Sequence, residues 1–457
     1  MKLERVTLAN FRGYDQIDLQ FEADVTVIAG VNGVGKSALL GAIVKAMSLV
    51  LPHITPSQEK VIGLADTDVK SGKDNLALSI LLNTSKANIY VDIARSAAIS
   101  AARAEELTIR RDKLRFATRE TKKRSKEEQE IKDEISRIEI QLASVEDVPT
   151  VRILPKESHT SQSPIVDTLE TEGAQPIAVF YSTSRFLSRL PPSLKAKAIK
   201  IATAYDKALD QLEVSLNDFA NWYRVLAEEN QSTRVARMFQ QLEAAIATFL
   251  PDVSSLSLHS ERPPRFSVQK NGSTFFLEQL SDGECGLLAL VFDLTRRLAI
   301  ANPVSDNPIA DGVALVMIDE IELHLHPKWQ RQVVRRLRDV FKNCQFVITT
   351  HSPQVIGQVN AKKLRLLSHD NAGKVILTEV SQAFGMDSSW VLQNIMGVPA
   401  RDYETEQELS KVFDAIDKGQ YEAARALAER MKVAIGDFPD LQEAFAILDR
   451  FELLELR

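Results

Sequence analysis

The feature that most constrains this chain is the segment GVNGVGKS at residues 30–37. We predict an apolar strand before it, over 24–29, and a helix after it, over 36–51, which we expect Pro52 to end. Glycines in such a loop let backbone N–H groups close around phosphate oxygens, and the amino terminus of the helix adds positive potential. The segment therefore predicts a phosphate-binding loop in an α/β fold, rather than a loop that merely turns the chain.

The side chains of this loop suit a nucleotide with a bound metal ion. A lysine at this position reaches the outer phosphates, and the following hydroxyl is a ligand for magnesium. The residues expected to contact the nucleotide are Asn32, Gly33, Gly35, Lys36 and Ser37, with Ser37 also on the metal.

A second apolar strand ends in two acids. The run VALVMI at 313–318 leads directly into Asp319 and Glu320. An aspartate at the end of such a strand can hold magnesium, and an adjacent glutamate can polarise a water against the γ-phosphate. A helix over 328–342 and a strand over 345–350 would complete a βαβ unit.

Other elements follow from periodicity and turn residues. Strands are predicted over 3–9, 16–21, 75–83, 87–94 and 177–182. Helical periodicity runs from about 193 to 250, where Pro251 ends it. A hairpin is expected at Asn271-Gly272, a helix from about Gly283 to Ala301, and mostly helix after 380.

Residues 103–140 carry twelve Lys or Arg and ten Asp or Glu, without glycine or proline. We expect a solvated helical segment, basic over 103–126 and acidic over 127–140. A helical hairpin bending near Arg124 and one continuous helix both stay open. The basic part, 103–126, has two possible roles. It either contacts nucleic acid or a partner protein, or it pairs as one half of a coiled coil. The Pro-, Ser- and Thr-rich range 147–176 is expected to be a linker.

Composition sets weaker limits. The formal net charge is −6, so any nucleic-acid surface has to be a local patch. Two cysteines, Cys285 and Cys344, cannot form a disulfide framework or a four-cysteine zinc site, and they fit a reducing cytosol. The amino terminus lacks the apolar core of a signal peptide, and VALVMI falls far short of a spanning helix. We therefore expect a cytoplasmic protein without a membrane partner.

Two further motifs complete a family pattern. LSDGE at 280–284 resembles the signature of ABC-type ATPases and lies at a helix start that Ser281 can cap. TTHSP at 349–353 follows a strand, as the switch histidine of that family does, here His351. The order of phosphate loop, signature, acid pair and switch is also that of the family.

This resemblance implies roles for the residues. The head would bind ATP with Mg2+ and close as a head-to-tail homodimer, each nucleotide lying between the Lys36 loop of one subunit and the signature of the other. The signature residues on the nucleotide would be Ser281, Gly283 and Glu284. Glu320 would be the general base, His351 would act near the γ-phosphate, and Asp319 would share the metal with Ser37.

The surroundings of these motifs resemble the SMC, RecF and OLD-type ATPases, which act on DNA. This resemblance rests on LANFRGY at 8–14, on DEIELHLHP at 319–327 and on the long spacing by which Ser281 follows Lys36, 245 positions. Arg12 is the residue these families place near the nucleotide. The long separation disfavours the ATPase subunit of a membrane importer.

One departure from the pattern concerns the glutamine expected after the strand at 177–182. FYSTSRF stands there, at 180–186, and Arg185 is the candidate substitute, which puts the glutamine's role in sensing magnesium in doubt.

His324 and His326 have the spacing of a metal pair on a strand. We favour instead the family's loop after the acid pair, which contacts the opposite subunit.

The tail narrows the expected function. After His351 there is no recognisable acidic nuclease motif, so nuclease chemistry would come from another chain. The compact ABC-type head with its helical insert and helical tail resembles the ATPase subunits of bacterial antiphage systems, most closely PtuA of Septu. The HNH-type nuclease partner of PtuA is a separate protein. The alternative is a RecF/SMC-like DNA repair or DNA-clamping ATPase without a nuclease. Assemblies of dimers are a further expectation, and direct DNA binding stays open. The basic face of the helix at 328–342 is either a surface that neutralises phosphates or, as we favour, a solvated helix face.

We therefore predict the α/β fold of an ABC-type P-loop ATPase head with mixed sheets, an inserted helical or coiled-coil segment and a helical C-terminal tail. The expected divisions are an N-terminal ATPase lobe at 1–95, the insertion at 96–146, the linker at 147–176, a helical lobe at 177–265, a C-terminal ATPase lobe at 266–380 and the tail at 381–457.

Overall fold

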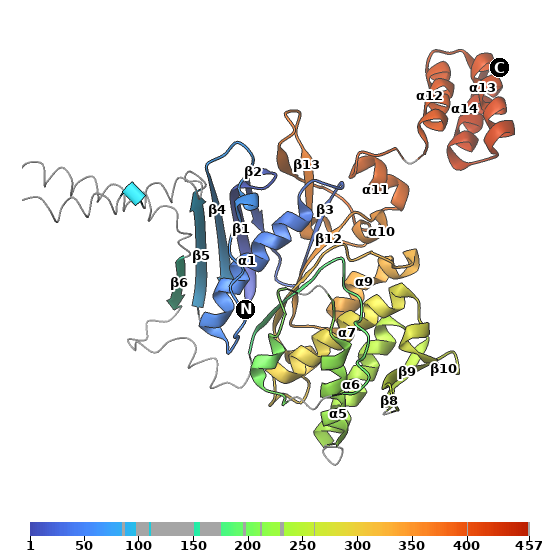
Figure 1. The fold of residues 1–457 in the computed structure, drawn as a ribbon. Helices are drawn as coiled ribbons and strands as arrows, with labels where there is room; N and C mark the ends of the chain where they lie inside the picture. Colours follow the sequence, from blue (N-terminus) through green and yellow to red (C-terminus); the bar gives the residue numbers. More distant parts are fainter. Residues whose placement is uncertain are drawn as a thin grey trace, which may run out of the picture. The chain divides into compact units, whose positions relative to one another are not determined.

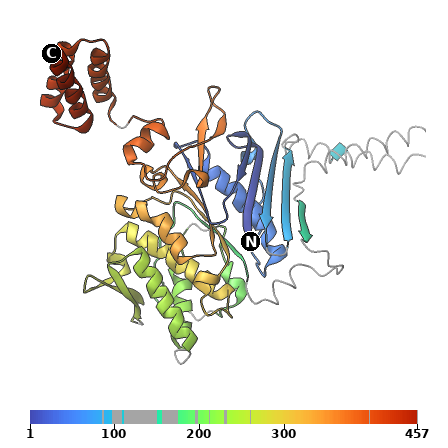
Figure 2. The ribbon, with the colours of Figure 1, turned by 180° about the vertical axis from the view of Figure 1, so that it is seen from behind.

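The computed structural model describes residues 1–84, 87–96, 109–110, 150–155, 175–194, 198–210, 213–228, 233–259, 261–399 and 401–455. The chain forms two compact units, Met1–Gly385 and Met386–Arg457. The expected charged insertion at 96–146 lies almost wholly outside the described residues, as does the choice between a hairpin and a single helix. Figures 1 and 2 show the ribbon from opposite sides.

The strand before the phosphate loop is a central strand of a six-stranded sheet with the order β14-β13-β3-β12-β11-β7. The bounds are β3 Val25–Gly30, β7 Ile177–Tyr181, β11 Ala314–Ile318, β12 Gln345–Thr350, β13 Leu364–His369 and β14 Val375–Thr378. All neighbours are parallel except β14, which is antiparallel to β13. Strands β3, β11 and β12 are buried throughout, as parallel strands covered on both faces are. Their carboxyl ends meet at one edge of the sheet, where α/β folds bind ligands.

A second sheet is antiparallel, with the order β2-β1-β4-β5-β6. Its strands are β1 Lys2–Phe11, β2 Tyr14–Gln20, β4 Asn75–Asn83, β5 Ala87–Ser96 and β6 Thr150–Pro155. The predicted hairpin of β4 and β5 is confirmed. The expectation of a linker is wrong for 150–155, because this segment pairs with β5 along its whole length.

Helix α1, Lys36–Ile54, packs on strands of both sheets. It is long and apolar enough to span a membrane, but 61% of its apolar window is buried in the protein. We read it as a core helix. Pro52 does not end it, contrary to expectation, because proline removes only one N–H and the last turn closes on Leu51. The main-chain oxygen of Leu51 accepts from the N–H of Thr55 at 2.9 Å and from its hydroxyl at 2.6 Å.

The remaining part of the first unit carries the helices and a small antiparallel sheet, β10-β9-β8. The elements are α5 Leu216–Glu228, α6 Thr233–Phe249, β8 Val253–His259, β9 Arg265–Lys270, β10 Ser273–Phe276, α7 Asp282–Ala301, α8 Pro308–Asp311, α9 Pro327–Val340 and α10 Pro353–Ile356. Asn271 and Gly272 turn the predicted hairpin with positive φ angles of 50° and 78°. The expected boundary at 265/266 cuts this sheet and is wrong in that respect.

The expectation of helix from about 193 is wrong for the described residues before Leu216, apart from the 3-10 turn Ile201–Ala204. Arg297 of α7 donates to the main-chain oxygens of Ala204 at 2.6 Å and of Asp206 at 3.1 Å. These carbonyl groups are therefore bonded to a side chain, and Lys207 has a positive φ of 52° that an α-helix does not accommodate.

The second unit holds α11 Ser388–Asn394, α12 Tyr403–Asp417, α13 Tyr421–Ile435 and α14 Pro439–Glu455. Apolar side chains of α12, α13 and α14 form one core, centred on Val412, Ala428 and Leu441, which are at most 1% exposed. Asp387 and Asp402 cap α11 and α12. The helical tail is confirmed.

Candidate functional site

The phosphate loop connects β3 to α1 with the backbone that its glycines allow. Gly33 and Gly35 have φ angles of 81° and 105°, and a Cβ atom at Gly33 would meet nothing within 4 Å. The first N–H groups of α1 have no acceptor within the helix, which suits them to phosphate oxygens. The loop thus fits the phosphates of a nucleotide.

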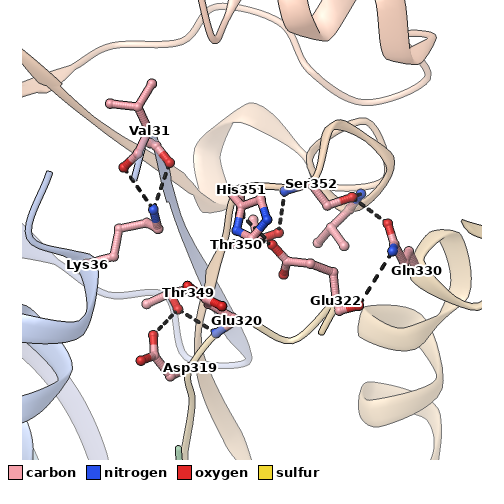
Figure 3. A network of polar contacts seen from close by, with 12 residues as sticks. Val31, Lys36, Asp319, Glu320, Glu322, Gln330, Thr349, Thr350, His351 and Ser352 are labelled. Atoms are coloured by element: carbon pink, nitrogen blue, oxygen red, sulfur yellow. Dashed lines mark hydrogen bonds and ion pairs between the residues drawn. The ribbon is translucent and has the colours of Figure 1, made fainter. Parts of the chain in front are cut away.

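Lys36 is held inside this loop. Its Nζ donates to the main-chain oxygens of Gly30 at 2.8 Å and Val31 at 3.0 Å, and the residue is 5% exposed (Figure 3). Burial lowers the pKa of Lys36, an effect opposed by the nearby acids Glu320, Glu322 and Asp319. A phosphate would replace two weak carbonyl acceptors with charged ones.

The β1–β2 turn supports the loop from the side. The hydroxyl of buried Tyr14 donates to the main-chain oxygen of Gly35 at 2.9 Å. Arg12, in the left-handed region with φ 48°, places Nε 2.9 Å from Oδ1 of Asp68. Lys45 of α1 lies 3.2 Å from the other oxygen of that carboxylate, whose side chain is fully buried.

Asp68 was not predicted as a site residue, and no local motif marks it. Burial alone would raise its pKa, but hydrogen bonds from the N–H of Ala65, from Arg12 and from Lys45 hold the pKa below the usual aspartate value. The charged carboxylate therefore anchors Arg12, whose side chain is 44% exposed.

The acid pair is fixed by a hydroxyl from the neighbouring strand end. Thr349 donates through Oγ1 to Oδ1 of Asp319 at 2.5 Å (Figure 3). Oγ1 of Thr349 also accepts a hydrogen bond from the N–H of Glu320 at 2.8 Å. Glu320 has a positive φ of 46°, which is uncommon for a residue with a side chain. Such strain is maintained only where surrounding contacts determine the geometry.

Arg185 supplies part of that constraint. Its guanidinium donates to the main-chain oxygens of Asp319 and Glu320, each at 2.6 Å, and the residue is 8% exposed. Burial lowers the pKa of Arg185 to about 10, opposed by Glu322, Asp319 and Glu320. A guanidinium has no lone pair for a metal. Arg185 lies after β7, where the glutamine was expected, and cannot be a magnesium ligand; that it substitutes for the glutamine stays a prediction.

The switch loop is tied to a third acid, Glu322. Oε1 of this buried side chain accepts from the backbone N–H of His351 at 2.6 Å and lies 3.0 Å from its Nδ1. Gln330 of α9 donates to the main-chain oxygen of Leu325 at 2.8 Å and accepts from the hydroxyl of Ser352 at 2.7 Å. Glu322 and Thr349 were also not singled out from the sequence, although both lie inside quoted motifs.

The signature lies at the start of α7. Ser281 caps the helix and exchanges hydrogen bonds with Glu284, as predicted for its side chain. Lys270 lies 2.6 Å from Oε1 of Glu284. A Cβ at Gly283 would lie 2.4 Å from the main-chain oxygen of His324, so only glycine fits. These described contacts are to the hairpin and the loop after the acid pair, not to the phosphate loop.

The histidine pair does not form the alternative metal site on a strand. His324 lies in the turn after the acid pair, and His326 is the N-cap residue of α9, where its Nδ1 accepts from the N–H of Lys328 at 3.2 Å. Among the described residues, no group of three or more His, Cys, Asp or Glu is placed to hold a metal. Magnesium shared by Ser37 and Asp319 would take phosphate oxygens and waters as its other ligands, as this ion commonly does.

The family described as "AAA domain, putative AbiEii toxin, Type IV TA system" matches residues 25–357. A Retron Ec83 probable ATPase from Escherichia coli is 28% identical over 434 residues, which cover 88% of this chain and 78% of that protein. A Septu protein PtuA from Bacillus mycoides (strain KBAB4) is 31% identical over 140 residues, covering 30% of this chain and 18% of that protein.

Among solved structures, the SmcHead bound to the C-winged helix domain of ScpA aligns with a TM-score of 0.45 at 14% identity, covering 83% of this chain and 98% of that one. The family match runs from β3 to α10 and so includes the phosphate loop, the signature, the acid pair and His351. This chain therefore belongs to that AAA domain family, and it is an ABC-type ATPase.

Proposed function

We propose that this chain binds ATP with Mg2+ between two head-to-tail heads, hydrolyses it, and uses its nucleotide state to control a separate HNH-type nuclease in antiphage defence. The observation that carries the ATP site is the convergence at one sheet edge. The carboxyl ends of β3, β11 and β12 bring Lys36, the acid pair and His351 together (Figure 3).

Each residue of the site has a role that follows from its chemistry. The N–H groups of the loop and Lys36 bind the phosphates, and Ser37 and Asp319 hold Mg2+. The bound metal neutralises charge on the outer phosphates. Glu320 accepts a proton from the attacking water, in a position set by Thr349 and Arg185. His351 faces the γ-phosphate, Arg12 lies beside the nucleotide, and Ser281, Gly283 and Glu284 act from the second head.

The similarity to retron and Septu ATPases supports a place in antiphage defence. In the tail, α12, α13 and α14 form a core of their own, and we assign this unit as the candidate contact for the partner. We place the complex in the reducing cytoplasm, where Cys285 and Cys344 stay free thiols as they are in the structure. DNA is a candidate ligand of the assembly.

The test of the ATP site is Glu320→Gln. The variant should keep ATP affinity within about threefold, lose roughly 100-fold or more of its hydrolysis rate and accumulate an ATP-bound dimer measured by light scattering. Exposed Glu379→Gln is the matched control and should behave as the parent does. Unchanged hydrolysis in Glu320→Gln would remove Glu320 from the role of base.

The partner is tested by co-purification with the products of adjacent genes, followed by mass measurement with and without ATP. An HNH protein in the complex is the expected result. A stable dimer on DNA with no nuclease would favour the RecF/SMC-like alternative, and a monomer under every condition would contradict both.

A further inference from the structure

We propose that Glu322 is a positioning residue for His351, accepting the Nδ1 proton of the ring and so leaving Nε2 as the nitrogen available to the nucleotide. The inference rests on the proposed function in one respect, that His351 faces the γ-phosphate. It assigns a role to an acid outside the pair Asp319 and Glu320.

The two side chains already touch. The side chain of Glu322 is 5% exposed, and its Oε1 lies 3.0 Å from Nδ1 of His351. This approach is not aligned as a hydrogen bond, so Nδ1 is buried without a hydrogen-bond partner. The second carboxylate oxygen of Glu322, Oε2, is also buried without one. A ring nitrogen and a carboxylate oxygen that each lack a hydrogen-bond partner thus lie on adjacent side chains.

Leaving both groups unpaired is costly. A buried polar atom without a partner loses its hydration and gains nothing in exchange, and the cost is larger for a charged group. The terminal torsions of glutamate and histidine are broad, so a small rotation of the carboxylate or the ring aligns the bond. Catalytic hydrogen bonds that are misaligned without substrate often tighten when it binds.

Backbone hydrogen bonds hold the loop of Glu322 and the loop of His351 next to each other. The N–H of His351 donates to Glu322 at 2.6 Å, and the N–H of Ile321 donates to the main-chain oxygen of Thr349 at 3.2 Å. Gln330 then joins the two loops through hydrogen bonds to Leu325 and Ser352. Because both loops are fixed, the carboxylate determines the orientation of the ring.

A phosphate oxygen on the other side of the ring changes its hydrogen-bond requirements. The ring nitrogen that carries a proton is set by the hydrogen-bond partner of the other nitrogen. The carboxylate of Glu322 can accept a hydrogen bond from Nδ1. A neutral side chain at 322 would not hold the ring as firmly.

The first test is a double-mutant cycle in the full-length chain. Glu322→Gln, which keeps the side-chain size, should lower kcat about tenfold with ATP affinity within about threefold, because a charge-assisted hydrogen bond is lost. Glu322→Gln combined with His351→Ala should be no slower than His351→Ala alone. Exposed Glu261→Gln should leave kcat unchanged. Losses that multiply in the double variant would overturn the proposal.

A second measurement does not depend on turnover. Nitrogen NMR of the histidine rings, with Mg2+ and a non-hydrolysable ATP analogue, should show one Nδ1 signal that disappears in His351→Ala and shifts in Glu322→Gln but not in Glu261→Gln. An unmoved signal overturns the proposal. Absence of ATP hydrolysis by the parent chain would instead contradict the proposed function, and the NMR result would still test the contact of Glu322 with His351.

Discussion

Arg185 donates a 2.6 Å hydrogen bond to the main-chain oxygen of Asp319, while its second terminal nitrogen reaches the next carbonyl along the chain. One guanidinium thus spans two successive peptide groups, and Glu320 keeps a positive φ of 46° beside it. A planar fork can bridge two acceptors, whereas an ammonium cannot do so in the same geometry.

We therefore expect Arg185→Lys to lower kcat about tenfold while changing the KM for ATP by less than about threefold, since the variant displaces Glu320, the proposed base, and not the phosphate loop. Steady-state hydrolysis at saturating Mg2+ measures both constants. Exposed Arg189→Lys is the control and should match the parent. A change in KM alone would assign Arg185 to nucleotide binding.

Two glycines of α7 give a second prediction. Gly283→Ala would push a methyl group to 2.4 Å from the main-chain oxygen of His324, whereas Gly286 has nothing within 4 Å of the same position. Gly283→Ala should therefore reduce both ATP-dependent dimerisation and hydrolysis at least tenfold. Gly286→Ala should retain both and raise the free energy of unfolding by about 1 kcal/mol, because alanine favours the helix. Equal behaviour of the two variants would contradict the contact.

Asp293 gives a prediction for stability. This residue of α7 is 1% exposed and bonds to Arg297 at 2.7 Å, Arg296 at 2.8 Å and the hydroxyl of Tyr181 at 3.0 Å. Asp293→Asn leaves two buried cations short of a partner, so it should lower the free energy of unfolding by about 3–5 kcal/mol. Denaturant titration measures this change. Asp306→Asn, at an exposed site, should stay within about 0.5 kcal/mol.

The pH dependence follows from the same group. Burial would raise the pKa of Asp293, but its arginine partners hold the pKa well below the usual aspartate value. A depressed folded-state pKa stabilises the protein fully above the unfolded-state pKa of about 3.9 and loses that effect as pH falls toward the folded value. The stability difference between the parent and Asp293→Asn should be constant from about pH 8 to 5 and shrink below about pH 4. A difference that grows on acidification would reverse the assigned sign.

The tail at 386–457 is expected to fold when expressed alone, because α12, α13 and α14 share one core. Circular dichroism should show a helical spectrum and a cooperative thermal transition. Leu441→Ala, at a fully buried position, should lower the free energy of unfolding by about 2–5 kcal/mol, and Val433→Ala, 89% exposed, should change it little. A fragment that stays unfolded would show that the tail depends on the head.

The sequence predicted the central strands and the motif loops well, because their chemistry is local. Glycines at 33 and 35, the acids after β11 and the cap at Ser281 each occupy a few adjacent positions. It failed where structure depends on distant partners. Strand β6 exists because β5 pairs with it, and Asp68 matters because Arg12 and Lys45 reach it from other elements.

The same reason explains the overestimated helix before Leu216. The local pattern there is helical, but Arg297 takes the carbonyl oxygens of Ala204 and Asp206, and no window around 204 contains that arginine. The role of Glu322 was hidden in another way. Glu322 lies two residues after the acid pair in the sequence, but its contact with His351 is evident only from the structure.

The place of β3 in the sheet has a consequence for synthesis of the chain. Its two neighbours, β12 and β13, come much later in the chain, because Val27 pairs with Ile348 and Leu364, which follow it by 321 and 337 residues. A nascent chain therefore exposes the complete phosphate-loop sequence long before either flanking strand has left the ribosome. The phosphate loop gains its flanking strands only after β12 and β13 have been synthesised, and a product cut short before β12 would carry the motif without either neighbouring strand.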